Sequence, residues 1–245
     1  MLLPDGAFRE IITFTPEETD PFGRVDGRAI LRRFQKIAGD HFDSLGFGRD
    51  IAVEHGCFWA AARTAVQIRT LPEIGRSLTL DTWPGRQAHG LYRRHYQLTD
   101  GDGGTLLRGM SVWVLMDLET RTLSAHREWM THPGGISRPG ELPGNIKCSV
   151  PAQLPLEARR TVTGAEADEN GHLNNTEYLR WGTDLLSPSF AAAHRLSGIC
   201  IEYKKELLLG QSAVLRYMTD ETSLYVRAEA EEKESFILRC DYDPV

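Results

Sequence analysis

One segment near the start of the chain, residues 28–45, carries apolar side chains at the spacing of a helical face. Its apolar positions recur every three or four residues, and Gly46 follows the last of them: Ile30, Leu31, Phe34, Ile37, Ala38, Phe42 and Leu45. Residues at this spacing lie on one side of a helix and would pack on a core, so the pattern predicts a long amphipathic helix. Gln35 and His41 lie on or beside this face, and we expect both to pack in the core.

The segments around this helix have the composition of strands separated by turns. Partial alternation and aromatic or β-branched residues predict strands over 8–14, 58–71, 77–83, 91–99 and 105–117. Residues 48–56 are expected to form a loop or a short turn. One helix followed by a meander of antiparallel strands predicts an α+β module with the helix on one face of the sheet.

The same order of elements returns after a segment rich in proline and glycine, residues 131–157. We interpret this segment as a linker, because loops of this length are uncommon inside compact domains. Beyond it we expect a strand from 159, a helix that ends at about Leu186 before Pro188, a short helical turn over 189–196, and strands over 199–205, 213–219, 223–230 and 236–242. The chain is therefore expected to form two modules, residues 1–130 and 158–245.

Polar side chains gather ahead of the second helix, in the run Asp-Glu-Asn-Gly-His-Leu-Asn-Asn over residues 168–175. Asp168, Asn170 and His172 alternate, so an extended segment would direct all three to one face. Asn174 or Asn175 would then cap the helix, whose N-terminus also favours negative charge. The run is a candidate catalytic site, although a polar turn with a structural histidine would have the same residue types.

A degenerate copy of this run lies in the first half of the chain and favours the catalytic interpretation. The turn from Asp20 to Gly27 aligns with Asp168 to Asn175 at a separation of 148 positions, and Gly75 aligns with Gly210 at a separation of 135. The polar positions are not repeated, since the residues opposite Asn170, His172 and Glu206 in the first copy are Phe22, Arg24 and Leu71. A duplicated module with one working site would differ in this way.

The run Asn-Gly-His-Leu-Asn-Asn-Thr-Glu-Tyr, residues 170–178, with Trp181 after it resembles the signature of the acyl-acyl-carrier-protein thioesterases of plants and bacteria. That signature reads Asp-x-Asn-x-His-Val-Asn-Asn, and this chain departs from it by Leu173. Further matching pieces lie in both halves: Asp20-x-x-Gly23, Gln35, Thr82-Trp83 and Glu202-Tyr-Lys-Lys-Glu206. The resemblance implies an α+β fold of two tandem hotdog modules, each a long helix wrapped by an antiparallel sheet.

The same resemblance implies a functional set of four residues for thioester hydrolysis: Asp168, Asn170, His172 and Glu206. By residue type, Glu206 or Asp168 would activate water. Asn170 would donate to the acyl carbonyl or to water, and His172 would orient a carboxylate or protonate the leaving sulfur. Attack by a carboxylate through a transient anhydride is the alternative to attack by water. The family often has Cys where this chain has Leu207, so no cysteine nucleophile is expected there.

Residues around this set are assigned to substrate binding. The first helix is expected to line the acyl groove, because its apolar face is wide and its copy of the site is degenerate. The substrate-binding candidates are Phe34, Ala38, Asn174, Asn175, Tyr178 and Trp181. No metal and no cofactor are expected, since His126 and His132 lack the spacing and context of a metal pair.

The composition limits the class of partner. The 245 residues are 41% hydrophobic and 25% charged, which is ordinary for a soluble globular protein, and the formal net charge of −6 argues against nucleic acid. An acidic carrier protein would need a local basic patch, for which the candidates are Arg93, Arg94, Arg159, Arg160, Lys204 and Lys205. The four cysteines show no metal spacing, so reduced thiols in a cytoplasmic protein are expected. We expect no signal or transit peptide and no membrane-spanning segment.

These observations favour an enzyme that hydrolyses fatty acyl-acyl carrier protein, with the acyl group on phosphopantetheine, to free fatty acid and carrier protein. Such an enzyme terminates fatty-acid synthesis. Two alternatives stay open: an acyl-coenzyme A hydrolase of the hotdog type, and a non-catalytic acyl-binding module. The intact cluster in the second copy argues against the binding module. The acyl chain length and the presence of a homodimer are not decided by the sequence.

Overall fold

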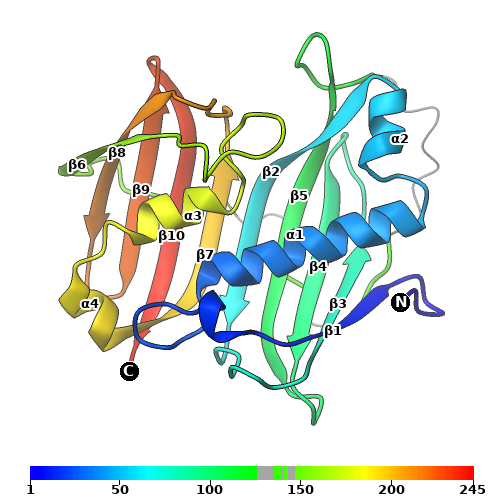
Figure 1. Cartoon of the computed structure of the whole chain (residues 1–245), viewed down its shortest axis with the longest axis horizontal. Helices are drawn as coiled ribbons and strands as arrows, with labels where there is room; N and C mark the ends of the chain where they lie inside the picture. The colour runs from blue at the N-terminus through cyan, green and yellow to red at the C-terminus, as the bar shows by residue number, and fades with distance from the viewer. Residues whose placement is uncertain (126–134, 140, 143–146) are drawn as a thin grey trace.

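The computed structural model describes residues 1–125, 135–139, 141–142 and 147–245, in which ten strands pair antiparallel into one sheet. Two helices, α1 and α3, lie on the same face of this sheet (Figure 1). The first half contains β1 (Phe8–Ile12), the 3₁₀ turn η1 (Pro16–Glu18), α1 (Gly27–Ser44), α2 (Arg49–Glu54), β2 (Cys57–Ile68), β3 (Leu78–Pro84), β4 (Tyr92–Thr99) and β5 (Thr105–Asp117). The second half contains β6 (Leu156–Thr161), α3 (Glu177–Thr183), α4 (Pro188–Ala193), β7 (His194–Tyr203), β8 (Ser212–Thr219), β9 (Ser223–Ala230) and β10 (Lys233–Pro244).

The order of strands in the sheet has an internal two-fold symmetry. The order β1-β3-β4-β5-β2 in the first half is followed by β7-β10-β9-β8-β6 in the second. The equivalent strands of the second half therefore follow in reverse order along the sheet, as a two-fold rotation requires. The register is also repeated: Ile12 pairs with Leu78 in the first half, and Arg160 pairs with Ala213 in the second. These pairs are separated by the same 148 and 135 positions as the aligned turns, which confirms the internal repeat and the tandem hotdog fold.

The two halves are joined through their central strands. β2 pairs with β7 from Arg63 opposite Glu202 to Gln67 opposite Gly198, so the backbone hydrogen bonds of the sheet continue across the boundary. The main cluster of buried apolar side chains contains residues of both halves, including Phe34 on α1 and Trp181 on α3. The modules therefore share one core.

The first helix agrees with its apolar pattern. Of the apolar positions expected to face the core, only Leu45 at the C-terminus is not buried. Phe34 stacks on Tyr96 of β4 with a ring separation of 4.1 Å, and Gly109 of β5 leaves room for it, because a Cβ there would lie 2.2 Å from the Phe34 ring. This close approach positions α1 against the sheet.

The second helix is much shorter than expected. α3 has 7 residues against 18 in α1, and it ends at Thr183 where a helix to about Leu186 was expected. Leu185 and Leu186 instead donate to carbonyls three residues back, in tight turns that lead to Ser187. Pro188 then begins α4, whose N-cap is Ser187, because proline fits the first position of a helix and not its interior.

Two connecting segments also differ from expectation. Residues 48–56 contain α2, which buries Ala52 in a small cluster with Cys57 and Tyr92, and so are more than a loop. The expected linker, 131–157, lies partly outside the described residues, and β6 already begins within it at Leu156. Its described part contacts the first half of the sheet through Ile136, whose N–H donates to the carbonyl of Pro84.

No helix in the described residues is long and apolar enough to cross a membrane.

Candidate active site

The polar run folds as a tight turn, and not as the extended segment that its alternation suggested. The Asp168 N–H donates to the His172 carbonyl at 2.7 Å, and Gly171 has a φ of +74°, which a glycine adopts without strain. The carboxylate oxygen Oδ1 of Asp168 accepts hydrogen bonds from the N–H groups of Asn170, at 2.9 Å, and His172, at 3.1 Å. Asp168 therefore shapes the turn that presents the two side chains after it.

The degenerate copy makes the same turn. Oδ1 of Asp20 accepts from the N–H groups of Phe22, at 2.9 Å, and Arg24, at 3.0 Å, and Gly23 has a φ of +75°. There the Arg24 side chain binds Asp20 and donates to the carbonyls of Ala191 and His194 at the end of α4. The first copy thus keeps the backbone of the site and uses it as a structural joint between the halves.

Glu206 is brought to the turn by the loop after β7, and not by a strand. The Leu173 N–H donates to the Leu207 carbonyl at 2.8 Å, and His172 forms a β-bridge with Leu208. As a result, Oε2 of Glu206 lies 3.7 Å from Nε2 of His172. The structure therefore brings together the predicted pair of a carboxylate and an imidazole.

Tyr178 holds this loop in place through a hydrogen bond. Its hydroxyl accepts the Leu207 N–H at 3.3 Å, and it is 3% exposed, so the ring is part of the core as well as the wall of the site. Burial raises the pKa of Tyr178 well above its usual range, and the charges of Glu206 and Asp168 act in the same direction. Its phenol is therefore a neutral structural partner.

Two large clefts meet at the cluster. One of about 540 Å³ is lined by Glu206 and Tyr178, and one of about 490 Å³ by Ala38 and Arg49. Their shared lining residues come from both halves of the chain: Phe58, Trp59, Arg121, Asp168, Asn170, His172 and Asn175. Clefts of this volume are typical of sites for small organic ligands.

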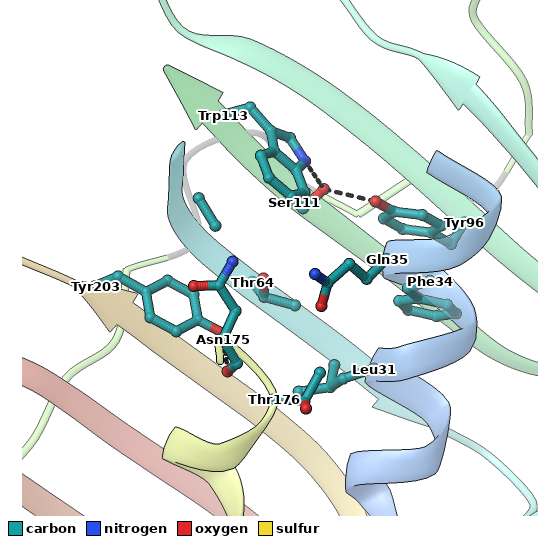
Figure 2. Close-up of a pocket in the computed structure, with 11 residues that line it drawn as sticks. Leu31, Phe34, Gln35, Thr64, Tyr96, Ser111, Trp113, Asn175, Thr176 and Tyr203 are labelled. Atoms are coloured by element: carbon teal, nitrogen blue, oxygen red, sulfur yellow. Dashed lines mark hydrogen bonds between the residues drawn. The ribbon is translucent and has the colours of Figure 1, made fainter. Parts of the chain in front are cut away.

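A small cavity of about 30 Å³ lies behind them, between α1 and the sheet. In Figure 2, Trp113 and Tyr96 approach Ser111 at one end of it, with hydrogen bonds of 2.6 Å and 2.8 Å to the serine hydroxyl. Phe34 and Gln35 of α1 line this cavity, and its volume leaves room for only a water molecule or two. Phe34 therefore faces this cavity and not the large clefts, and Gln35 is exposed, contrary to the core position expected for it.

Two further expectations about this region are wrong. Trp181 was assigned to the substrate, but it is 1% exposed, lines neither large cleft, and donates from Nε1 to Glu166 at 2.9 Å. Neither Asn174 nor Asn175 is the N-cap of α3, because that position is Thr176. Oδ1 of Asn174 accepts a hydrogen bond from the N–H of Thr176 within the preceding turn.

The helix N-terminus is also not free to bind an anion. Glu177 occupies the first turn of α3 with a side chain 2% exposed, and it pairs with Arg28 at 3.1 Å and Arg32 at 2.9 Å.

The first half contributes residues that the motif did not reveal. Nη2 of Arg121, in the turn after β5, pairs with Oε2 of Glu206 and lies 3.3 Å from Nε2 of His172. Arg49 of α2 pairs with Glu169, and its Nη2 lies 3.4 Å from Oδ1 of Asn170. The positions of Arg49 and Arg121 in the sequence carried no signal, because both lie outside the motif and reach it only through the fold.

The basic patch expected for a carrier protein is not assembled from the six candidate residues. Arg94 is 1% exposed and lies against Nδ1 of His41 at 2.9 Å, so it belongs to the core. Arg93 on β4 and Arg159 on the edge strand β6 lie in different halves of the sheet. Only Lys204 and Lys205 line a cleft at the site.

Among the described residues there is no group of three or more His, Cys, Asp or Glu side chains that could hold a metal ion. His126 and His132 lie outside the described residues.

Two family models match this chain and together cover most of it. Residues 7–131 match the acyl-ACP thioesterase N-terminal domain, and residues 154–241 match the acyl-ACP thioesterase C-terminal domain. The chain belongs to the acyl-ACP thioesterase family. The match of one model to each half agrees with the symmetry of the sheet.

Relatives of this acyl-ACP thioesterase family member include plant enzymes. It is 26% identical over 238 residues to a chloroplastic palmitoyl-acyl carrier protein thioesterase of Cuphea hookeriana, covering 89% of this chain and 56% of the relative. It is 24% identical over 226 residues to a chloroplastic dodecanoyl-[acyl-carrier-protein] hydrolase of Umbellularia californica, covering 86% of this chain and 59% of the relative. The chain thus spans less than two thirds of the length of these relatives.

Solved structures of the family have the same fold. An acyl-ACP thioesterase from Bacteroides thetaiotaomicron superposes with a TM-score of 0.84 at 21% identity, covering 97% of this chain and 98% of that one. The 12:0-ACP thioesterase of Umbellularia californica superposes with a TM-score of 0.84 at 21% identity, covering 98% of both chains. These matches confirm the tandem hotdog architecture.

Proposed function

We propose that this chain hydrolyses fatty acyl-acyl carrier protein to free fatty acid and carrier protein, and so terminates fatty-acid synthesis. The observation that carries the proposal is the position of Glu206 beside His172, 3.7 Å away, at the junction of two large clefts, within the fold of the acyl-ACP thioesterase family. The matched plant relatives are named for this reaction on palmitoyl, dodecanoyl and oleoyl carrier proteins.

Glu206 is the base in this proposal. Of the two carboxylates considered, Asp168 has Oδ1 bound to two backbone N–H groups, as Asp20 has in the degenerate copy. Glu206 has no equivalent in that copy, where Leu71 stands, and its side chain is 42% exposed in the cleft. A residue present only in the copy with the complete cluster is the better candidate for a chemical role.

The reaction then proceeds by attack of water on the thioester. Glu206 takes a proton from water, and the oxygen of that water bonds to the acyl carbon while the carbonyl electrons move to its oxygen. The contact from Arg49 assigns Oδ1 of Asn170 as an acceptor, so its NH₂ group is available to donate to this oxyanion. The oxyanion collapses and the carbon–sulfur bond breaks. The leaving thiolate then takes the proton from Glu206, which yields the acid and the thiol.

Purified protein assayed with acyl-carrier-protein and acyl-coenzyme A thioesters of matched chain length tests the proposal. We expect the larger kcat/KM with the carrier protein. Equal or higher values with coenzyme A would favour an acyl-coenzyme A hydrolase instead. Acyl binding without release of free thiol from either substrate would favour the binding module.

The second cleft is expected to hold part of the acyl chain. Ala38 lines it on α1, so Ala38→Leu would fill space there and lower kcat/KM for the longest acyl substrate by about tenfold, since each excluded CH₂ is worth about 0.8 kcal/mol. The sequence suggested Ala29 for the same role, but Ala29 is buried and lines neither large cleft, so Ala29→Leu is the matched control. Hydrolysis measured over a series of chain lengths would contradict this role for Ala38 if both variants kept the original preference.

Cysteine is not expected to take part in catalysis. None of the four cysteines lines either large cleft, and burial raises the pKa of the Cys240 thiol well above its usual range. Cys200→Ser and Cys240→Ser should each keep turnover within a few-fold. The buried hydroxyl in Cys240→Ser should lower the free energy of unfolding by about 1–3 kcal/mol. Steady-state hydrolysis by each folded variant checks this, and a folded variant without activity would contradict it.

We also propose a cytoplasmic location, where the four free thiols would stay reduced. Fractionation of cells that express the full-length protein tests this point. A homodimer stays a prediction, which sedimentation of the purified protein tests.

A further inference from the structure

We propose that Arg121 is a positioning residue of the hydrolytic site, supplied by the first half of the chain to hold Glu206 and His172 of the second half in place. The proposal rests on the hydrolase function proposed above. Arg121 lies outside the sequence motif, 51 positions before His172 and 85 before Glu206, and reaches them only through the fold.

One nitrogen of the Arg121 guanidinium contacts both partners. Its Nη2 pairs with Oε2 of Glu206 and lies 3.3 Å from Nε2 of His172. The direct separation between Glu206 Oε2 and His172 Nε2 is 3.7 Å, which is too long for a hydrogen bond. The carboxylate and the imidazole are therefore held in a fixed relation by the guanidinium and not by a bond to each other.

This contact also determines the form of the imidazole. A guanidinium has donors and no acceptor, so in this contact Nε2 of His172 accepts, which requires the tautomer with the proton on Nδ1. Arg121 therefore selects the tautomer of His172 in this arrangement.

The role is geometric more than energetic. The side chains of Arg121 and Glu206 are 37% and 42% exposed, so water screens the charge between them and the pair adds little to stability. A reacting group displaced by about 1 Å, in contrast, can lose a factor of about 100 in rate. Loss of Arg121 should therefore affect the chemical step far more than the folding of the chain.

The main chain holds Arg121 ready for these contacts. Oδ1 of Asp117 accepts from the N–H groups of Glu119, at 3.1 Å, and Thr120, at 2.8 Å, and the Arg121 N–H donates to the Asp117 carbonyl at 3.1 Å. Arg121 has a φ of +56°, a conformation that a residue with a side chain keeps only where its surroundings impose it. Its guanidinium then lies 4.5 Å from the centre of the Phe58 ring, which limits its movement.

The chain offers a matched ion pair without access to the site. Arg63 of β2 pairs with Glu202 of β7 at 2.9 Å, across the same boundary between the halves. Arg63 and Glu202 line neither large cleft. Arg63→Ala therefore removes an arginine that joins the halves and leaves the hydrolytic site intact.

The experiment compares Arg121→Ala, Arg121→Lys and Arg63→Ala in steady-state hydrolysis of a long-chain acyl-acyl carrier protein. We expect Arg121→Ala to lower kcat by about 10- to 100-fold with KM changed less than about threefold, and Arg63→Ala to stay within a few-fold of the original enzyme. Guanidinium ion at millimolar, non-denaturing concentration should restore part of the Arg121→Ala turnover, whereas methylammonium should restore less. The kcat of Arg121→Lys should lie between those of Arg121→Ala and the original enzyme, because an ammonium cannot contact both partners with the same geometry.

A double variant separates positioning from a general loss of structure. Arg121→Ala should slow the Glu206→Gln enzyme by much less than it slows the original enzyme, because a large part of the arginine's effect acts through that carboxylate. Unchanged kcat in Arg121→Ala, equal losses in the Arg121 and Arg63 variants, or additive losses in the double variant would each overturn the proposal. Should Arg121→Ala fail to fold, Arg121→Gln carries the same comparison. An original enzyme that hydrolyses no thioester would instead refute the proposed function.

Discussion

Replacing Glu206 by Gln is expected to lower turnover of a long-chain acyl thioester by about 100-fold or more, the usual scale for loss of a positioned base. The substitution keeps the size of the side chain and removes only its charge and its capacity to take a proton. Because the Glu206 side chain is 42% exposed, the free energy of unfolding should change by less than about 1 kcal/mol. The effect should appear in kcat, since the proton is transferred in the chemical step.

The control is another glutamate that forms ion pairs in the same half of the chain. Glu234 of β10 pairs with Lys204 at 2.7 Å and with Arg227 at 3.1 Å, and it lines neither large cleft. Glu234→Gln should keep turnover within a few-fold. Steady-state hydrolysis with measured melting temperatures compares the two variants, and full activity in folded Glu206→Gln would exclude Glu206 as the base.

The repeat could be predicted from the sequence because its turns have strict local requirements. A carboxylate that accepts two backbone N–H groups, followed at the third position by a glycine with positive φ, needs Asp and Gly at fixed spacing in both copies. These requirements survive where the chemistry is lost. The register of β1 with β3 and of β6 with β8 follows the same separations, so the tandem architecture was readable from two short segments.

The composition of the site was only half readable, because half of it comes from the other module. Arg121 lies in the turn after β5 and Arg49 lies in the short helix α2. Both come close to the motif only in the folded chain, and nothing in their local sequence marks them. Trp181 shows the opposite error. It lies close to the motif in sequence, but the helix turns it into the core, where its ring nitrogen binds Glu166. Proximity along the chain was a poor guide to which face of α3 the residue occupies.

The two copies of the turn allow the structural and chemical parts of the site to be measured separately. Asp168→Ala and Asp20→Ala each remove a carboxylate oxygen that accepts two backbone N–H groups, so each should lower the free energy of unfolding by about 1–3 kcal/mol. Only Asp168→Ala should lower turnover, by about 100-fold, because Asn170 and His172 depend on that turn for their positions. Thermal or denaturant unfolding and steady-state hydrolysis of both variants check the pair. An equal loss of turnover in folded Asp20→Ala would show that the site does not depend on its own turn in particular.

Asp168→Asn then decides whether the carboxylate of Asp168 also transfers a proton. The side-chain carbonyl of Asn accepts hydrogen bonds as a carboxylate oxygen does, so the bonds to the Asn170 and His172 N–H groups can persist. If Asp168 acts only by shaping the turn, Asp168→Asn should keep most of the turnover that Asp168→Ala loses. If Asp168 were the base, both substitutions would be equally inactive, because an amide takes no proton from water at neutral pH. The structure favours the first outcome, since Oδ1 of Asp168 makes the same two bonds in the site as Oδ1 of Asp20 makes in a copy with no catalytic cluster.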